Sequence, residues 1–294
     1  MHTEYTNCLL CARKCGVNRE SGARGYCRSS AVMHVSRADL HYWEEPIIAG
    51  TKGSGTVFFS GCSLGCIFCQ NHEISRASVG REVSENELAD IMLDLQTRGA
   101  HNINFVTATH YAPSIIAATQ IARNKGLLLP IVYNTGSFDA IKTIEMLRGT
   151  VDIYLPDFKY YRRETAASLA NAANYPDVAL AAIREMVSQQ STPIIDNGIM
   201  RKGVIIRILL LPGHLAEAKL SLSRLYREFG DSVYFSLMGQ YTVMHGMPHP
   251  LDRRVTISEY AELVSYAEKL GIVNGFTQEL SSSGVEYIPK FNTK

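Results

Sequence analysis

The cysteines are the residues of this sequence most able to do chemistry, and they are not scattered. Four lie near the amino terminus, three follow later, and the sequence has none beyond Cys69; the two groups are Cys8, Cys11, Cys15 and Cys27, then Cys62, Cys66 and Cys69. Thiolates three or four positions apart can converge on one centre without strain. In a reducing compartment such spacing favours metal or redox chemistry over a disulfide framework.

The second group forms a C-x3-C-x2-C loop directly after a predicted strand, Thr56–Ser60. Gly61 and Gly65 allow the backbone to fold tightly around a bulky inorganic centre. Three thiolates fill three corners of a cubane [4Fe–4S] cluster that normally takes four, so one iron stays free to bind another ligand. A three-cysteine zinc site completed by His72 is the alternative.

The first group has the spacing of a closed four-thiolate site, Cys8-x2-Cys11-x3-Cys15-x11-Cys27. We expect a structural Zn²⁺ there, with an auxiliary iron–sulfur cluster as the alternative. A zinc site would let a short segment fold together with its metal, whereas a cluster could relay electrons. The sequence therefore predicts a small amino-terminal metal-binding cap, residues 1–54, followed by a main domain, residues 55–294.

In the main domain, short apolar runs alternate with amphipathic stretches of helical length. The predicted strands are Thr56–Ser60, Ile103–Ala108, Ile131–Asn134, Val151–Leu155, Val204–Leu211 and Val233–Leu237, with a further short one near Gly275–Gln278. The predicted helices are Ser84–Arg98, Pro113–Lys125, Phe138–Leu147, Glu164–Asn171, Asp177–Gln189, Leu215–Phe229 and Ser258–Leu270. Ser84 with Glu87 predicts a capping box, and Ser258 is expected to cap the last helix.

This alternation is typical of βαβ units around a parallel sheet. Six such units are too few to close an eight-stranded barrel. We therefore predict an α/β fold, a partial (β/α)6 TIM-like barrel with the chemistry at the carboxyl ends of its strands.

The cysteine loop and its position after the first strand resemble the signature of radical S-adenosylmethionine (SAM) enzymes. The resemblance implies that SAM binds the open iron and that one electron from the reduced cluster cleaves SAM to methionine and a 5′-deoxyadenosyl radical. That radical would abstract a hydrogen atom from the substrate. More narrowly, nearly the whole chain is similar to the pyruvate formate-lyase activating enzymes, and most of all to an uncharacterised branch related to them with four amino-terminal cysteines.

The resemblance also implies residues that contact SAM. Phe68 matches an aromatic residue that packs near the SAM adenine, with simple core packing as the alternative. Thr107 lies in a run that precedes the SAM-binding motif of the activating enzymes, but the motif itself is replaced here. Thr109 and His110 are therefore expected to contact the SAM amino group by position; a loop histidine without a ligand role is the alternative.

Three further polar positions follow later strands. Asp157 and Lys159 are similar to an Asp-x-Lys pair that hydrogen-bonds SAM, and alternate positions share one face of an extended segment; a surface ion pair is the alternative. Arg207 resembles the arginine that holds the SAM carboxylate or ribose, and an arginine inside an apolar strand needs a partner. Asn134 is expected to contact the ribose, unless it only shapes a turn.

The bulk properties restrict the partners. The formal net charge is +1, from 29 Lys and Arg against 28 Asp and Glu, so no overall attraction to nucleic acid or to an anionic membrane is expected. No apolar run approaches the ~20 residues that span a bilayer. The start of the chain lacks the pattern of a secretory signal, so we expect a cytoplasmic protein. The resemblance implies a one-electron reductant such as flavodoxin or ferredoxin.

The predicted function is a radical SAM enzyme whose substrate would be a protein partner of the glycyl-radical type. Activating enzymes with an auxiliary-cluster insert carry extra cysteines soon after the SAM motif, but Gln70–Arg81 contains none. A peptide, a small metabolite or RNA therefore stays open as substrate. The alternative is an electron-transfer or binding protein with two metal centres and no SAM turnover, which the polar positions around the cleft disfavour. No catalytic side chain is assigned.

Overall fold

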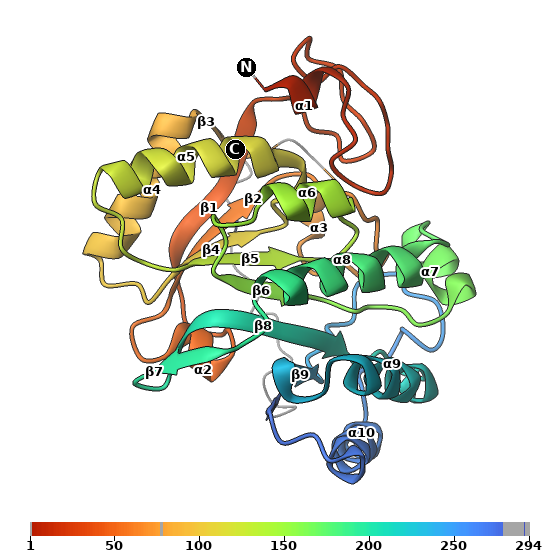
Figure 1. The fold of residues 1–294 in the computed structure, drawn as a ribbon. Coiled ribbons are helices and arrows are strands. Elements are labelled where there is room, and N and C mark those ends of the chain that lie inside the picture. The colour runs from red at the N-terminus through yellow and green to blue at the C-terminus, as the bar shows by residue number, and fades with distance from the viewer. Residues whose placement is uncertain (1, 77–78, 279–290, 292–294) are drawn as a thin grey trace.

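The computed structural model describes residues 2–76, 79–278 and 291. Its strands are β1 Met33–His41, β2 Ser54–Phe59, β3 Arg81–Val83, β4 Ile103–Val106, β5 Ile131–Thr135, β6 Ile153–Pro156, β7 Ile194–Asp196, β8 Ile199–Leu209, β9 Tyr234–Met238 and β10 Gly275–Thr277. Its α-helices are α1 Thr3–Thr6, α2 Pro46–Ala49, α3 His72–Ser75, α4 Glu85–Thr97, α5 Ala112–Asn124, α6 Ile141–Met146, α7 Arg163–Ala170, α8 Tyr175–Gln189, α9 Leu215–Phe229 and α10 Ile257–Leu270 (Figure 1).

One sheet runs through the molecule in the order β10-β9-β8-β6-β5-β4-β2-β1-β3. From β2 to β10 every neighbouring pair along this order is parallel. All six predicted strands lie in this parallel run, and the short seventh is β10. The predicted α/β fold, a partial barrel built from βα units, is thus confirmed.

Three antiparallel strands were not predicted. β1 and β3 extend the sheet beyond β2, and β7 pairs with β8. β1 lies within the segment assigned to the amino-terminal cap, so the main sheet extends into residues 1–54. Only the first half of β1 is buried, which weakens the apolar pattern by which a strand is recognised in sequence. The glycine-containing stretch 50–55 ends inside β2.

Two helix starts test the capping predictions. The Ser84 hydroxyl accepts from the backbone N–H of Glu87 at 3.3 Å, and the Glu87 carboxylate accepts from the Ser84 N–H at 2.8 Å, so the predicted capping box is confirmed. The cap predicted at Ser258 is wrong. Thr256 caps α10 instead, because Glu259 stands three residues after it and completes the reciprocal pair.

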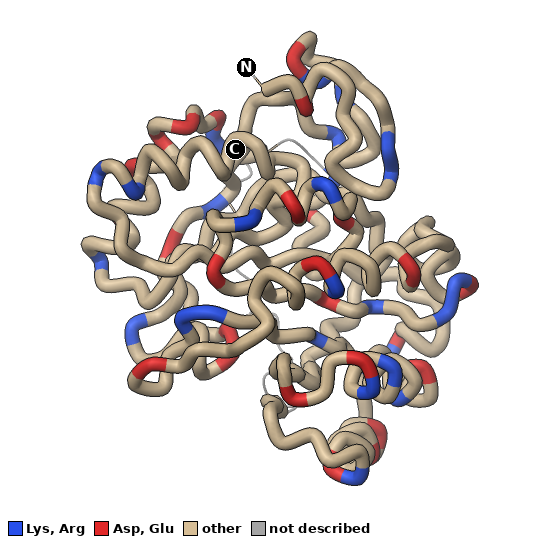
Figure 2. The backbone as a smooth tube through the Cα atoms, viewed as in Figure 1, with Lys and Arg blue, Asp and Glu red and all other residues tan. Residues whose placement is uncertain are grey.

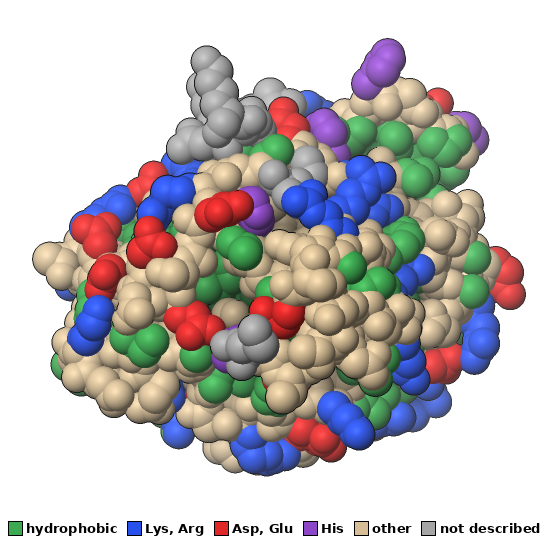
Figure 3. Space-filling view, turned by 90° about the horizontal axis from the view of Figure 1, so that it is seen from above, with side chains coloured by type: hydrophobic (Ala, Val, Ile, Leu, Met, Phe, Trp, Pro, Cys, Tyr) green, Lys and Arg blue, Asp and Glu red, His purple; other side chains and the backbone are tan. Residues whose placement is uncertain are grey.

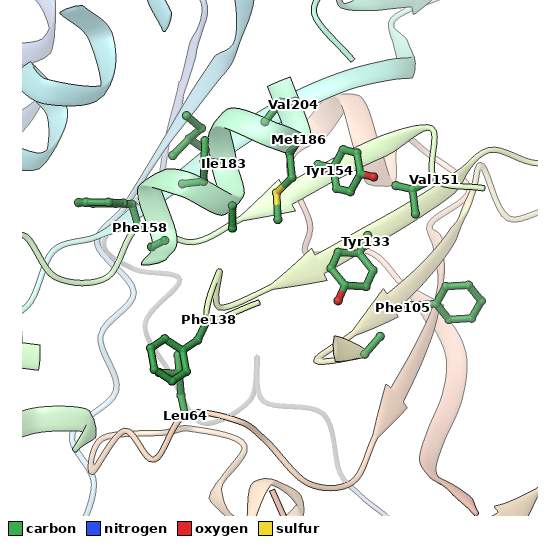
Figure 4. Packing of buried hydrophobic residues seen from close by; sticks show 14 of the residues in the cluster. Leu64, Phe105, Tyr133, Phe138, Val151, Tyr154, Phe158, Ile183, Met186 and Val204 are labelled. Atoms are coloured by element: carbon green, nitrogen blue, oxygen red, sulfur yellow. The ribbon is translucent and has the colours of Figure 1, made fainter. Parts of the chain in front are cut away.

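Alternate side chains of the parallel strands β5 and β6 pack on opposite faces of the sheet. Tyr133 of β5 and Tyr154 of β6 point outward and belong to the main core with Ile183 and Met186 of α8 (Figure 4). Val132, Ile153 and Leu155 point to the other side, where they pack around Ile48 of α2. Since neighbouring residues of a strand face opposite sides, α2 fills part of the concave face that the outer helices leave uncovered.

The charged residues lie mainly on the outer helices and the connecting loops (Figure 2). One face of the molecule shows acidic, basic and hydrophobic side chains together (Figure 3). In the described part of the chain no helix combines the length and the apolar character needed to cross a membrane.

Candidate functional site

A cavity of about 240 Å³ opens at the carboxyl ends of the parallel strands. Residues at or just after the ends of the strands form its wall; representative residues are Cys62, Thr107, Asn134, Asp157, Arg207 and Met238. In barrels of this architecture, this edge is where substrates bind. The fold therefore gathers into one pocket residues that are far apart in the sequence.

Cys62, Cys66 and Cys69 all line this pocket and are partly exposed. The backbone N–H of Leu64 lies 3.4 Å from the Cys62 sulfur, and the Tyr160 hydroxyl donates to the Cys66 sulfur at 3.2 Å. Burial, followed by the neighbouring thiols of Cys69 and Cys66, raises the pKa of Cys62 to about 12. Cys66 and Cys69 therefore lie close enough to Cys62 to oppose its ionisation.

The repulsion between ionised sulfurs indicates what kind of group these three cysteines could hold. Ionised thiolates this close together need positive charge between them, which iron ions in a cluster supply. Three soft sulfur donors on one glycine-containing loop suit a cubane with one remaining corner. The residues present fit the predicted cluster, and all three cysteines line one pocket.

Asp157 and Lys159 follow β6 and line the pocket, as the alternate spacing predicts. The Lys159 Nζ donates to the Asp157 carboxylate at 2.6 Å, so the two form an ion pair inside the pocket rather than on the outer surface. Burial acts to lower the pKa of Lys159, but Asp157 and Cys66 outweigh it and raise that pKa above its ordinary value. A fixed positive charge thus stands beside the cysteine loop.

Arg207 also lines the pocket, and its partners were not predicted. Its Nε and Nη2 donate to the Glu45 carboxylate at 2.8 and 2.6 Å, and Nη2 also pairs with Glu44. Burial acts to raise the pKa of Glu45, but Arg207 outweighs it and lowers that pKa. A buried guanidinium needs charged or hydrogen-bonding partners, and here two carboxylates supply them. The adjacent pair Glu44-Glu45 before Pro46 was the signal available in the sequence.

The loop after β4 carries Thr109 and His110, which were both expected to contact SAM, but the two side chains lie in different surroundings. Thr107 and Thr109 line the pocket, whereas His110 is not among the described residues that do. His110 is 2% exposed, and its Nε2 lies 2.8 Å from the carbonyl oxygen of Ser60. Burial, with Arg19 nearby, lowers the pKa of His110 to about 3, so the ring is neutral. Because a carbonyl only accepts, this nitrogen carries the proton.

Phe68 and Asn134 both line the pocket. The Phe68 ring lies 6.4 Å from that of Tyr160 and 6.0 Å from that of Tyr241, so it packs against aromatic neighbours while facing the cavity. Asn134 is the last residue but one of β5. Both residues line the cavity, and their contacts with SAM stay predictions. Tyr160, the hydrogen-bond donor to Cys66, was missed because no short motif marks it.

The four amino-terminal cysteines lie outside this pocket. Cys8, Cys11 and Cys27 are buried and Cys15 is exposed. Burial, followed by Cys27, Cys15 and Cys8, raises the pKa of Cys11 to about 12, so the four sulfurs lie within electrostatic reach of one another. Among the described residues, in this group and in the pocket loop alike, no three or more Cys, His, Asp or Glu are arranged to hold a single metal ion. Zinc or a cluster at this group stays a prediction.

Comparison with known protein families finds a match to the radical SAM superfamily over residues 56–218, more than half of the chain. A curated relative, an uncharacterized protein of Methanocaldococcus jannaschii, is 28% identical over 277 residues, which cover 91% of this chain and 76% of the relative.

Solved structures share the fold at low sequence identity. SuiB of Streptococcus suis bound to S-adenosylmethionine superposes with a TM-score of 0.53 and 13% identity, over 74% of this chain and 48% of SuiB. Methylornithine synthase (PylB) superposes with a TM-score of 0.51 and 17% identity, over 81% of this chain and 74% of PylB. This chain thus spans about half the length of SuiB.

Proposed function

This chain belongs to the radical SAM superfamily, and on that premise we propose that it is an enzyme whose Cys62, Cys66 and Cys69 hold a [4Fe–4S] cluster that binds SAM. The observation that carries the proposal is the meeting of these three thiols, in one pocket, with polar side chains from the ends of the other strands. When bound, the reduced cluster supplies the electron that cleaves SAM to methionine and a 5′-deoxyadenosyl radical, which takes a hydrogen atom from the substrate.

The side chains of this pocket have proposed roles in holding SAM. Asp157 and Lys159, already paired at 2.6 Å, offer an acceptor and a donor beside the cysteine loop. Thr107, Thr109 and Asn134 present short polar groups to the same cavity. Arg207 would act at the SAM carboxylate or ribose, although its guanidinium is already bound by Glu44 and Glu45. Phe68 would pack near the adenine, which its place in the pocket wall supports.

The finer assignment is an activating enzyme of the pyruvate formate-lyase type, acting on a glycyl-radical protein and taking its electron from flavodoxin or ferredoxin. It rests on the sequence resemblance over nearly the whole chain. The amino-terminal cysteines would hold a structural zinc or an auxiliary iron–sulfur cluster, and the part of residues 1–54 that precedes β1 would act as the cap that carries it. No protein side chain is assigned as the hydrogen donor or as an acid or base.

The test is anaerobic reconstitution with iron and sulfide, reduction by dithionite, addition of SAM, and measurement of 5′-deoxyadenosine. Wild-type protein should form this product, and Cys66→Ala, which removes a cluster ligand, should not. Iron and zinc counted per chain would show which metals the protein carries. If a fully loaded cluster gives no product with SAM, the proposal is wrong in this form and the electron-transfer alternative gains support.

The finer assignment has its own experiment. A candidate glycyl-radical protein is mixed with the reduced enzyme and SAM, and electron paramagnetic resonance (EPR) is recorded. A SAM-dependent organic radical on the partner protein would support the activating-enzyme type. Formation of 5′-deoxyadenosine with a peptide or small molecule instead would redirect the search for the substrate without affecting the reaction class.

A further inference from the structure

The segment that carries the amino-terminal cysteines packs directly on the cysteine loop of the pocket. Gly61, the first residue of that loop, has a φ of 88°, and a Cβ placed there would lie 2.6 Å from the carbonyl oxygen of Cys27. A contact this close to backbone leaves no room for a side chain. We call residues 8–30 the amino-terminal clamp, because they press against the loop that holds Cys62, Cys66 and Cys69.

Arg13 makes the clamp's most direct bond to this loop. Its Nε donates to the carbonyl oxygen of Ser63 at 2.9 Å, between the first and second cluster cysteines. Its other two nitrogens donate to the carbonyl oxygens of Ala170 and Asn171, at 3.1 and 2.5 Å. The guanidinium lies 3.7 Å from the centroid of the Tyr26 ring. A flat fork with several donors can span these carbonyls and stack on a ring, which a lysine cannot do.

Arg19 connects the clamp to the loop after β4, and it is 1% exposed. Its Nη1 donates to the carbonyl oxygen of His110, and its Nε to that of Ser29 at 3.2 Å. His110 in turn donates to Ser60, the residue just before the cysteine loop. This chain of hydrogen bonds joins the clamp, the loop that carries Thr109 and the end of β2.

Neither arginine belongs to the described residues that line the pocket. Both bind backbone carbonyl oxygens of the loops that form the pocket, so both act on the position of those loops rather than on a ligand. The clamp also rests on α6, where the Leu10 carbonyl accepts from the Thr143 hydroxyl at 2.7 Å, and Met146 packs against the cluster of Tyr5, Cys8 and Leu10. In Figure 1 this red segment lies beyond α6, at the edge of the molecule.

We propose that the amino-terminal clamp is a positioning device for the SAM site, in which Arg13 fixes the cysteine loop and Arg19 fixes the loop that carries Thr109. This inference deepens the proposed function and rests on it, because the two loops matter only if they hold a cluster and SAM. Groups that orient the ligands of a metal centre typically change metal affinity or activity by 10–100-fold when removed. An arginine outside the pocket therefore controls how the pocket holds its ligands.

The test uses Arg13, because Arg19 is fully buried and its replacement endangers folding. Arg13→Gln removes the fork and the charge, Arg13→Lys keeps the charge and loses the fork, and Lys14→Gln removes a charge from an exposed neighbouring position as the matched control. Each full-length protein is reconstituted to equal iron content. The EPR spectrum of the reduced cluster is recorded without SAM, and the SAM dissociation constant is then measured.

Arg13→Gln and Arg13→Lys should both change the EPR spectrum of the reduced cluster and weaken SAM binding by about tenfold. Lys14→Gln should match the wild type in both. If Arg13→Gln does not fold, as judged by its thermal transition, Tyr26→Leu takes its place, since it removes the ring beneath the guanidinium and should shift both readouts in the same direction. A wild-type spectrum together with wild-type SAM affinity in the substituted protein would overturn the proposal.

These readouts separate this inference from the proposed function. If the wild-type protein binds SAM but forms no 5′-deoxyadenosine, the proposed reaction fails, while the spectrum and the SAM affinity still test the clamp. If the wild type forms 5′-deoxyadenosine and the Arg13 variants match it in spectrum and SAM affinity, the reaction stands and the clamp fails.

Discussion

In the loop after β2, three cysteines line a pocket, and Cys66 has the charge of Lys159 and the hydroxyl of Tyr160 beside it. In the amino-terminal clamp, three of the four cysteines are buried and none lines the pocket. The side chain is the same in both regions. The difference is in the surroundings: the loop stands over the open ends of parallel strands, while the clamp packs on the outside of that loop. A cysteine group becomes a site for a small ligand only where the fold leaves space beside it.

Two buried arginines repeat this contrast. Arg207 in the pocket is held by the carboxylates of Glu44 and Glu45. Arg19 in the clamp is held by the carbonyl oxygens of Ser29, Ser30 and His110 and lies 3.8 Å from the Cys8 sulfur. Carboxylates hold the charge of Arg207 in the pocket, and backbone carbonyl oxygens hold the charge of Arg19 in the clamp. Separate substitutions can therefore test the two regions.

The largest expected effect separates the two cysteine groups. Cys69→Ala should lower 5′-deoxyadenosine formation by more than about 100-fold, because it removes one of three proposed cluster ligands. Cys15→Ala should lower it less than tenfold, because that side chain is exposed and lies outside the pocket. Both rates are measured at equal protein concentration after the same reconstitution. Equal losses in the two variants would remove the distinction between the groups.

The next effect concerns the carboxylates that hold Arg207. Glu45→Gln should lower the free energy of unfolding by about 3 kcal/mol, because breaking a buried ion pair leaves a buried charge without its partner. The matched control is Glu228→Gln, which breaks a pair with Arg184 at the surface and should cost at most about 1 kcal/mol. Urea titrations of the metal-free proteins measure both. A cost for Glu45→Gln no larger than the control would mean that Glu44 alone holds the arginine.

A smaller effect, on stability at low pH, is expected at His110, which hydrogen-bonds both to Arg19 of the clamp and to Ser60. Its pKa is about 3 in the folded protein and about 6.5 in an unfolded chain, so the folded state binds the proton more weakly. The neutral ring stabilises the fold fully above about pH 6.5, and this contribution is lost as the pH falls toward 3. Near pH 5 the loss should be about 1–2 kcal/mol.

His110→Gln should therefore flatten the fall in stability between about pH 6.5 and 4. The control His249→Gln changes a side chain that is 81% exposed, and it should leave the pH profile as in the wild type. Thermal unfolding followed across this pH range measures the slopes. A profile for His110→Gln as steep as that of the wild type would show that other groups cause the acid sensitivity.

The smallest expected effect tests the hydrogen bond from Tyr160 to Cys66. Tyr160→Phe removes a donor 3.2 Å from the sulfur, which should make the cluster harder to reduce and slow product formation several-fold when the reductant is limiting. Tyr154→Phe is the control, since its hydroxyl donates to Gln189 and not to a cysteine. Redox titration followed by EPR gives the reduction potential of the cluster in each protein. The same potential in all three proteins would exclude a role for this hydrogen bond.

Much of the fold could be predicted from the sequence because its signals are local. The parallel strands follow from β-branched runs, and the start of α4 follows from Ser84 and Glu87, three residues apart. β1 was not predicted, because about half of its residues are only partly buried and its apolar pattern is therefore weak. Its pairing with β2 depends on tertiary contacts rather than on the local sequence pattern. The cap of α10 was placed two residues late, because serine and threonine stand close together there.

The sequence alone determined the cysteine loop, since ligand type and spacing are properties of a short segment. It also indicated that Asp157 and Lys159 share a face, because a strand alternates its side chains. Only the tertiary structure decided which distant groups meet these residues. Glu45 lies 162 positions from Arg207 and Tyr160 lies 94 from Cys66, and such contacts depend on which strands and loops lie side by side in the folded sheet.

The same physical reason turned His110 away from the pocket. Its neighbour Thr109 lines the cavity. The ring of His110 instead donates a hydrogen bond to the carbonyl oxygen of Ser60 and is buried beside Tyr111. A sequence position fixes the loop on which a side chain lies. The direction of that side chain is decided by the burial and hydrogen bonds available after the sheet, the loops and the amino-terminal clamp have come together.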